Sequence, residues 1–122
     1  YMEKLDFTIL TSISEGQPLS VLESLAACRP CVTTEVGCCR ELLEGAPGDD
    51  FGVAGFVTPP MYRKGLADAM ERMCTSRARR IEMGERGQRR VATYFLHKQM
   101  LANYRALYDE TARAFDLPRE GE

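Results

Sequence analysis

Residues 5–34 read LDFTILTSISEGQPLSVLESLAACRPCVTT, and this stretch decides the fold. Residues 5–13 are rich in β-branched and aromatic side chains, which predicts a strand mostly buried on both faces. A Gly/Pro turn ends that strand, and apolar residues then recur at helical spacing over residues 19–28. A second short strand is predicted over residues 31–34, so the stretch predicts a strand–helix–strand unit.

The rest of the chain continues this alternation and then becomes helical. The predicted elements are a short helix over residues 40–44, a strand over residues 54–58, and helices over residues 61–76, 77–94 and 97–115. Gly84 and Gly87 predict a break in the second of these three long helices. The last one carries an apolar stripe, formed by Met100, Leu101, Tyr104, Leu107 and Tyr108. Alternating strands and helices predict an α/β fold: a parallel sheet with right-handed crossovers, followed by a helical C-terminal portion.

Composition indicates one globular domain over residues 1–122, with 44% hydrophobic and 28% charged residues. The net charge of -2 shows no basic excess, so we do not expect nucleic-acid binding. No apolar run approaches the roughly 18 residues of a membrane span, and no signal peptide is visible, which predicts a cytoplasmic protein. The chain starts with Tyr1 and enters the apolar run 7–10 almost at once. We therefore expect a domain cut from a longer protein.

Two glutamates, Glu15 and Glu23, stand in the turn and in the helix that follows it, with seven residues between them. A helix N-terminus has unpaired backbone N–H groups and a partial positive charge, so it can hold a phosphate. Carboxylates beside it can accept hydrogen bonds from sugar hydroxyls. Taken alone, Glu23 fits a solvated helix residue and Glu15 a loop or capping acid. Together they predict a site for a nucleotide sugar.

A second turn repeats the pattern over residues 34–41, TEVGCCRE, where a strand end is followed by a glycine and a helix start. Glu41 falls in the first helical turn, where the helix dipole also favours an acid for purely structural reasons. Ligands of parallel sheets bind beyond the carboxyl ends of the strands. Both turns are therefore expected to face one crevice.

The five cysteines are Cys28, Cys31, Cys38, Cys39 and Cys74. The first two have the C-x2-C spacing of zinc ligands, but the next two are adjacent and lack it. We expect no metal site, and thiols that are buried or line a surface. Arg40, the only cation near the motif, is expected to be a surface residue. His97, the lone histidine, is expected to be a helix-start or surface residue.

At this point the residues resemble a known family, the retaining glycosyltransferases of family 4 with the two-lobed GT-B fold. The resemblance rests on Glu15 and Glu23 and on the segments LAACRPCV (25–32), VGCCRE (36–41), AGFVTPP (54–60), LADA (66–69) and MGERG (83–87). It covers about 110 residues. The segments SEGQPLS (14–20) and CRELL (39–43) are most similar to the Pel exopolysaccharide glycosyltransferases.

The resemblance implies that the chain is the Rossmann-like, C-terminal, donor-binding lobe of a hexosyltransferase. Such an enzyme moves a sugar from a nucleoside diphosphate, here expected to be UDP, to a glycan in exopolysaccharide synthesis. It retains anomeric configuration and needs no metal or other cofactor. The glycan acceptor site would belong to an N-terminal lobe upstream of these residues, so the isolated lobe is expected to bind donor weakly and to be inactive.

The resemblance implies that Glu15 is the catalytic residue and contacts the donor sugar. It also implies that the donor is bound by Gly16, Gln17, Leu19, Ser20 and Glu23. Glu23 would accept hydrogen bonds from the ribose, and backbone amides would meet the rest of the donor. Pro18 offers no N–H group. Cys28 and Cys38 replace glycines of the family pattern, and a side chain at Cys38 is expected to crowd the phosphate or change the turn.

Three other functions also fit parts of the sequence. A nucleotide-sugar epimerase lobe would use the same fold for different chemistry. A thiol-rich metal or redox module would use the cysteines of residues 28–39. A non-catalytic Rossmann-like interaction domain would leave Glu15 and Glu23 without a ligand.

Overall fold

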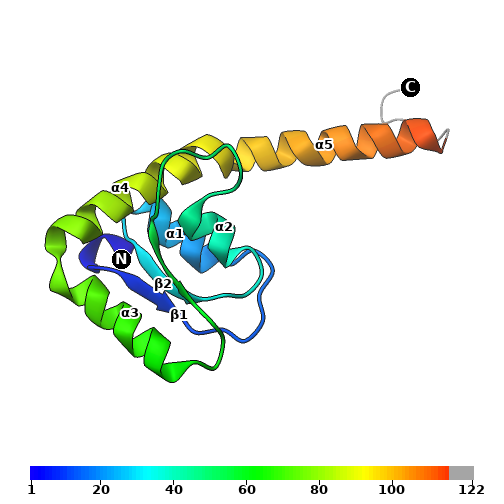
Figure 1. Ribbon diagram of the computed structural model, residues 1–122. Helices are drawn as coiled ribbons and strands as arrows, with labels where there is room; N and C mark the ends of the chain where they lie inside the picture. The colour runs from blue at the N-terminus through cyan, green and yellow to red at the C-terminus, as the bar shows by residue number, and fades with distance from the viewer. Residues whose placement is uncertain (116–122) are drawn as a thin grey trace.

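A computed structural model describes residues 1–115 and shows a three-stranded parallel sheet in the order β1-β2-β3 (Figure 1). The strands are β1 (Thr8–Leu10), β2 (Cys31–Thr34) and β3 (Gly55–Thr58). Thr8 lies opposite Cys31 in one pair, and Cys31 lies opposite Gly55 in the other. The predicted parallel sheet is confirmed, and β2 has the predicted bounds.

The helices are α1 (Leu19–Ala26), α2 (Cys39–Glu44), α3 (Arg63–Thr75), α4 (Arg77–Tyr94) and α5 (His97–Ala114), with a 3-10 turn at Met2–Lys4. Side chains of α1 and α2 form one buried cluster with Cys31, and side chains of α3 form another with Val32. Successive strand residues point to opposite faces of a sheet. Therefore α1 and α2 cover one face of the sheet and α3 covers the other.

The first strand is shorter and less buried than predicted. β1 contains only three residues, and Ile9 at its centre is 42% exposed. Within the described residues β1 pairs with β2 alone, so it is an edge strand, and the exposure of Ile9 shows that one of its faces is not covered. The β-branched residues identified the strand but could not show how many neighbours it has.

The predicted break in the helix over residues 77–94 is wrong, because α4 is continuous. Gly84 and Gly87 are buried where α4 packs against α1 and the residues after it. A Cβ atom at Gly84 would overlap the carbonyl oxygen of Cys28, and one at Gly87 would come within 2.5 Å of a Leu25 methyl carbon. These glycines permit close packing and do not interrupt the helix.

A buried arginine holds α4 to the end of α2. Arg90 is 1% exposed, and its guanidinium donates to both oxygens of Asp49 at 2.5 and 3.0 Å. It also donates to the carbonyl oxygens of Leu42, Leu43 and Gly52 at 3.1, 3.2 and 2.7 Å. All five N–H groups of the guanidinium therefore have acceptors. The hydrogen bond from Arg90 lowers the pKa of Asp49.

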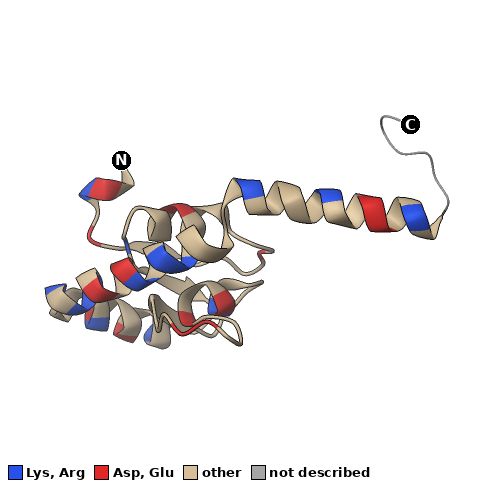
Figure 2. Ribbon diagram, turned by 90° about the horizontal axis from the view of Figure 1, so that it is seen from above, with Lys and Arg blue, Asp and Glu red and all other residues tan. Residues whose placement is uncertain are grey.

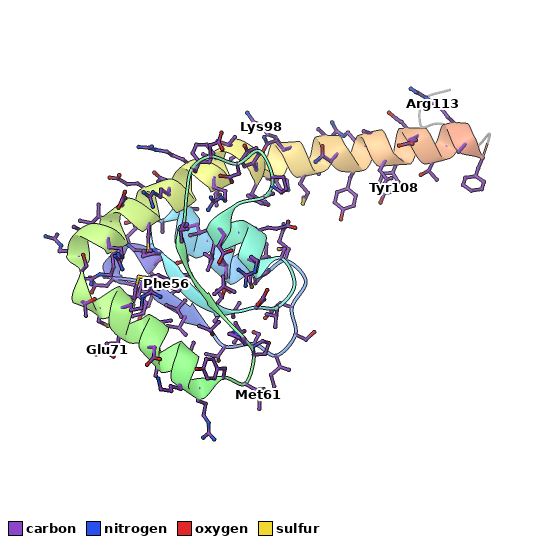
Figure 3. All side chains as sticks on the ribbon, in the orientation of Figure 1. Phe56, Met61, Glu71, Lys98, Tyr108 and Arg113 are labelled. Carbon is purple, nitrogen blue, oxygen red and sulfur yellow. The ribbon has the colours of Figure 1, made fainter. Side chains whose placement is uncertain are left out.

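Helix α5 extends beyond the rest of the domain (Figure 1), and the view turned by 90° shows the same projection (Figure 2). None of its residues is buried within the described part of the chain. Tyr108 extends from the side of α5 toward which α2 lies, and Lys98 and Arg113 extend from the opposite side (Figure 3). Among the described helices, none has the length and apolar character that crossing a membrane requires.

Candidate functional site

The site is built around the start of α1, which follows the first strand-end turn. Pro18 is the N-cap residue, and its carbonyl oxygen accepts from the N–H groups of Val21 and Leu22 at 3.2 and 3.4 Å. No side chain caps this helix start. Within residues 1–115 the N–H groups of Leu19 and Ser20 have no acceptor, so they remain free to bind an anion.

The second turn packs directly against the first. Gly37 has a φ of +51°, and a Cβ atom there would overlap the backbone carbonyl groups of Glu15 and Gly16. The next amide, that of Cys38, donates to the carbonyl oxygen of Gly16 at 3.0 Å. Close approach and positive φ together require glycine at this position. The two turns therefore form one structural unit, although they are separated by α1 and β2.

The glycine missing at position 38 is not required by the backbone. Cys38 has a φ of −92°, which any residue adopts, so the unusual turn geometry lies at Gly37 instead. Cys38 is half-buried, and burial raises the pKa of its thiol while a hydrogen bond with Gln17 opposes that shift. The thiol is therefore protonated at neutral pH.

The carboxylate of Glu15 is held by Ser12, which is not among the predicted site residues. Glu15 is half-buried, and one of its oxygens accepts from the hydroxyl of Ser12 at 2.6 Å. The carbonyl oxygen of Ser12 in turn accepts from the hydroxyl of Thr34, the last residue of β2, at 2.5 Å. The two residues are three positions apart in an irregular segment, and no helix-start or turn pattern of the sequence indicates this pair.

Glu23, on α1, lines a groove with a volume of about 670 Å³. The groove runs between α1 and the junction of α4 with α5. Its lining residues are Gln17, Leu19, Leu22, Glu23, Ala26, Val91, Tyr94, Phe95, Leu96, His97, Met100, Asn103, Tyr104 and Leu107. The carboxylate of Glu23 is exposed and accepts no hydrogen bond from residues 1–115.

The predicted site residues do not all line the groove. Gln17, Leu19 and Glu23 line it. Glu15 and Gly16 lie against the Gly37 turn and are not part of the groove lining. Ser20, in the exposed first turn of α1, is not part of the groove lining either.

The two other candidate residues, Arg40 and His97, occupy positions that structure alone explains. Arg40 forms exposed ion pairs with Glu35 at 2.8 Å and Glu44 at 2.7 Å, as a surface residue would. The exposed first residue of α5 is His97, a helix-start position as expected. It also faces the groove that Glu23 lines.

The cysteines are free thiols, of which Cys31 and Cys39 are buried. Burial raises the pKa of the Cys31 thiol to about 11, so it is protonated at neutral pH. Among the described residues no three or more His, Cys, Asp or Glu side chains converge in the way that a metal site requires. Geometry therefore offers no support for the thiol-rich metal module.

Comparisons with known proteins bear on the family and the fold of the chain. Residues 1–76 match the family described as Glycosyl transferases group 1. Among solved structures, sucrose-phosphate synthase from Thermosynechococcus elongatus is similar, with a TM-score of 0.73 and 23% sequence identity. The match covers 88% of this chain and 26% of the synthase, so the chain spans about a quarter of the synthase's length. A search of curated proteins gave no match. The likeness confirms the predicted fold, a parallel α/β lobe of the GT-B type.

Proposed function

The chain belongs to the family of group 1 glycosyl transferases, and from this membership we propose that it is the donor-binding half of a retaining glycosyltransferase of family 4. In this proposal the complete enzyme transfers a sugar from a nucleoside diphosphate, UDP in the first instance, to a glycan. The segments similar to the Pel glycosyltransferases favour a role in exopolysaccharide synthesis. The acceptor binds the other lobe of the enzyme, and the reaction takes place in the cytoplasm.

The observation that carries the proposal is the open start of α1 between two acids. The N–H groups of Leu19 and Ser20 have no acceptor within the described residues. Pro18 leaves that end of the helix without a side-chain cap. Glu15 lies in the turn that precedes this helix start, and Glu23 lies on the helix and lines the groove. An anion with hydroxyl-bearing groups at both ends fits this arrangement, and a nucleoside diphosphate sugar is such an anion.

In this proposal the diphosphate, the ribose and the sugar of the donor bind at three different positions. The diphosphate binds at the amides of Leu19 and Ser20, where the helix dipole favours its charge and stabilises the departing nucleotide without a metal ion. The ribose lies in the groove, where Glu23 accepts hydrogen bonds from its hydroxyls. The sugar lies over the Gly37 turn, where the carboxylate of Glu15 contacts it as the catalytic residue. Gly16 and Gln17 complete the contact with the donor.

A titration of the chain with UDP, GDP and their sugar conjugates tests the donor site. We expect a UDP conjugate to bind and Glu23→Ala to weaken binding by about 1–3 kcal/mol, because one acceptor of ribose hydroxyls is lost. That is roughly a 5- to 150-fold rise in Kd. NMR spectra of the wild type should show shifts at the amides of Leu19 and Ser20.

The matched control is Glu71→Ala, which removes the same charge from an exposed position on α3, away from the groove. It should leave the Kd unchanged. Equal affinities of wild type and Glu23→Ala would remove Glu23 from the site. No binding of any nucleotide sugar would instead favour an interaction domain.

A further inference from the structure

We propose that Ser12 is a positioning residue that aims Glu15 at the donor sugar, and that Glu15 acts through only one of its two carboxylate oxygens. The inference rests on the proposed function, because it assigns the support of the acid that contacts the sugar. Ser12 touches no part of the donor in this arrangement and acts through Glu15.

The first step is the hydrogen bond from the hydroxyl of Ser12 to one oxygen of Glu15, at 2.6 Å. A hydroxyl that donates to a carboxylate at this distance makes a strong, charge-assisted hydrogen bond. The other oxygen of Glu15 accepts no hydrogen bond within residues 1–115. One oxygen is therefore occupied by the protein, and the second remains available to a sugar hydroxyl.

The second step is the support of Ser12 itself. Its carbonyl oxygen accepts from the hydroxyl of Thr34 at 2.5 Å, and Thr34 is only 5% exposed at the end of the central strand β2. The sheet thereby fixes the position of Ser12, although Ser12 itself lies in an irregular segment after β1. Hydrogen bonds that fix a functional side chain from behind are what a preorganised site requires.

The third step is the support of the Glu15 backbone. Gly37 packs against the carbonyl groups of Glu15 and Gly16, and the amide of Cys38 donates to Gly16. The backbone is thus held from the second turn while the side chain is held by Ser12. Both supports come from the end of β2 and the residues that follow it, so the carboxylate has one defined direction relative to the start of α1.

The test measures UDP release from UDP-glucose by the natural full-length protein, as the glucosyl group passes to a glycan hydroxyl or to water, with the variants Ser12→Ala and Ser12→Thr. We expect Ser12→Ala to lower kcat about 10- to 100-fold, because a misplaced catalytic group loses rate rather than affinity. KM for the donor should change less than about twofold, since the ribose and diphosphate contacts remain. Ser12→Thr keeps a hydroxyl and should recover most of the rate. The control Ser14→Ala removes an exposed hydroxyl next to Glu15 and should act as wild type.

A double-mutant cycle separates positioning from general stability. If Ser12 acts through Glu15, then Ser12→Ala should cost nothing further in the background of Glu15→Ala. Additive losses in the two variants would overturn the inference, and so would a Ser12→Ala enzyme with the kcat of Ser14→Ala. Should Ser12→Ala not fold, Thr34→Val removes the supporting hydrogen bond with little change in shape, and an unchanged kcat there would equally overturn it. Failure of the wild type to bind any nucleotide sugar would contradict the proposed function instead.

Discussion

Helices α4 and α5 have the same length, 18 residues, but within the described part of the chain α4 buries four residues and α5 buries none. The sequence favours the opposite result, because α4 is basic and contains two glycines while α5 carries a regular apolar stripe. The burial of a helix therefore depends on which other elements lie beside it, and not on its own apolar pattern alone. α4 supports α1, which carries the candidate site, and α5 forms only the outer wall of the groove.

Arg90 provides the strongest test of how tightly α4 is held. Arg90→Ala leaves the carboxylate of Asp49 buried without its partner, and removing one member of such a pair costs about 3–5 kcal/mol of unfolding free energy. Urea denaturation monitored by circular dichroism measures the loss. Because small domains have only about 5–15 kcal/mol in total, this loss is a large share of the stability of the domain.

The neighbouring Arg89 is the matched control, because it is exposed on the same helix. Arg89→Ala should change the unfolding free energy by less than about 0.5 kcal/mol. Similar losses in the two variants would mean that the ion pair of Arg90 and Asp49 does not hold α4 to the domain.

Gly84 tests the closeness of α4 to α1. Gly84→Ala improves helix propensity by about 1 kcal/mol, yet its Cβ atom would overlap the backbone oxygen of Cys28, which cannot rotate away. We expect a net loss of about 1–3 kcal/mol in urea denaturation, as in other overpacked sites. Glu85→Ala at the exposed neighbouring position should be nearly neutral. A Gly84→Ala variant more stable than wild type would mean that α4 lies farther from α1 than the structure shows.

Cys28 lies at the same contact and tests the strain stored there. It has a φ of +57°, a left-handed conformation that costs a residue with a Cβ atom roughly 1–2 kcal/mol. Cys28→Gly should therefore raise the unfolding free energy, by about 0.5–1 kcal/mol after the added freedom of the unfolded chain is subtracted. Cys28→Ala loses the thiol but keeps the Cβ atom, so it should show no gain. Equal stability of all three proteins would exclude backbone strain at this position.

Local sequence patterns predict those features, such as helix starts and strand bounds, that depend on residues close together in the sequence. The start of α1 and the bounds of β2 follow from breakers and periodicity within a few residues. The need for glycine at position 37 depends in addition on the carbonyl groups of Glu15 and Gly16, which lie far away in the sequence. The hydrogen bond from Thr34 to Ser12 joins residues 22 positions apart, and that from Arg90 to Asp49 joins residues 41 positions apart. No local pattern specifies such pairs. In the sequence, nothing distinguishes Arg90 from its neighbour Arg89 in the same basic helix.

The same limit applies to predictions of how far an element is buried. The composition of β1 predicts burial on both faces, but composition does not show which elements pack against each face, and Ile9 is exposed. The cysteine for glycine replacement at position 28 was visible in the sequence, and the structure gives it a conformation that glycine prefers. The replacement at position 38 looked equivalent in the sequence, yet that residue has an ordinary backbone conformation.

Helix α5 offers the smallest expected effect and completes the comparison. Leu107 is 54% exposed, so Leu107→Ala should change the unfolding free energy by less than about 0.5 kcal/mol. Leu25→Ala, in the buried cluster of α1, should cost about 2–5 kcal/mol for the same loss of atoms. A loss above about 1 kcal/mol for Leu107→Ala would show that α5 packs against the domain in solution. The groove beside Glu23 would then be narrower than the structure shows, and less room would remain there for a ribose.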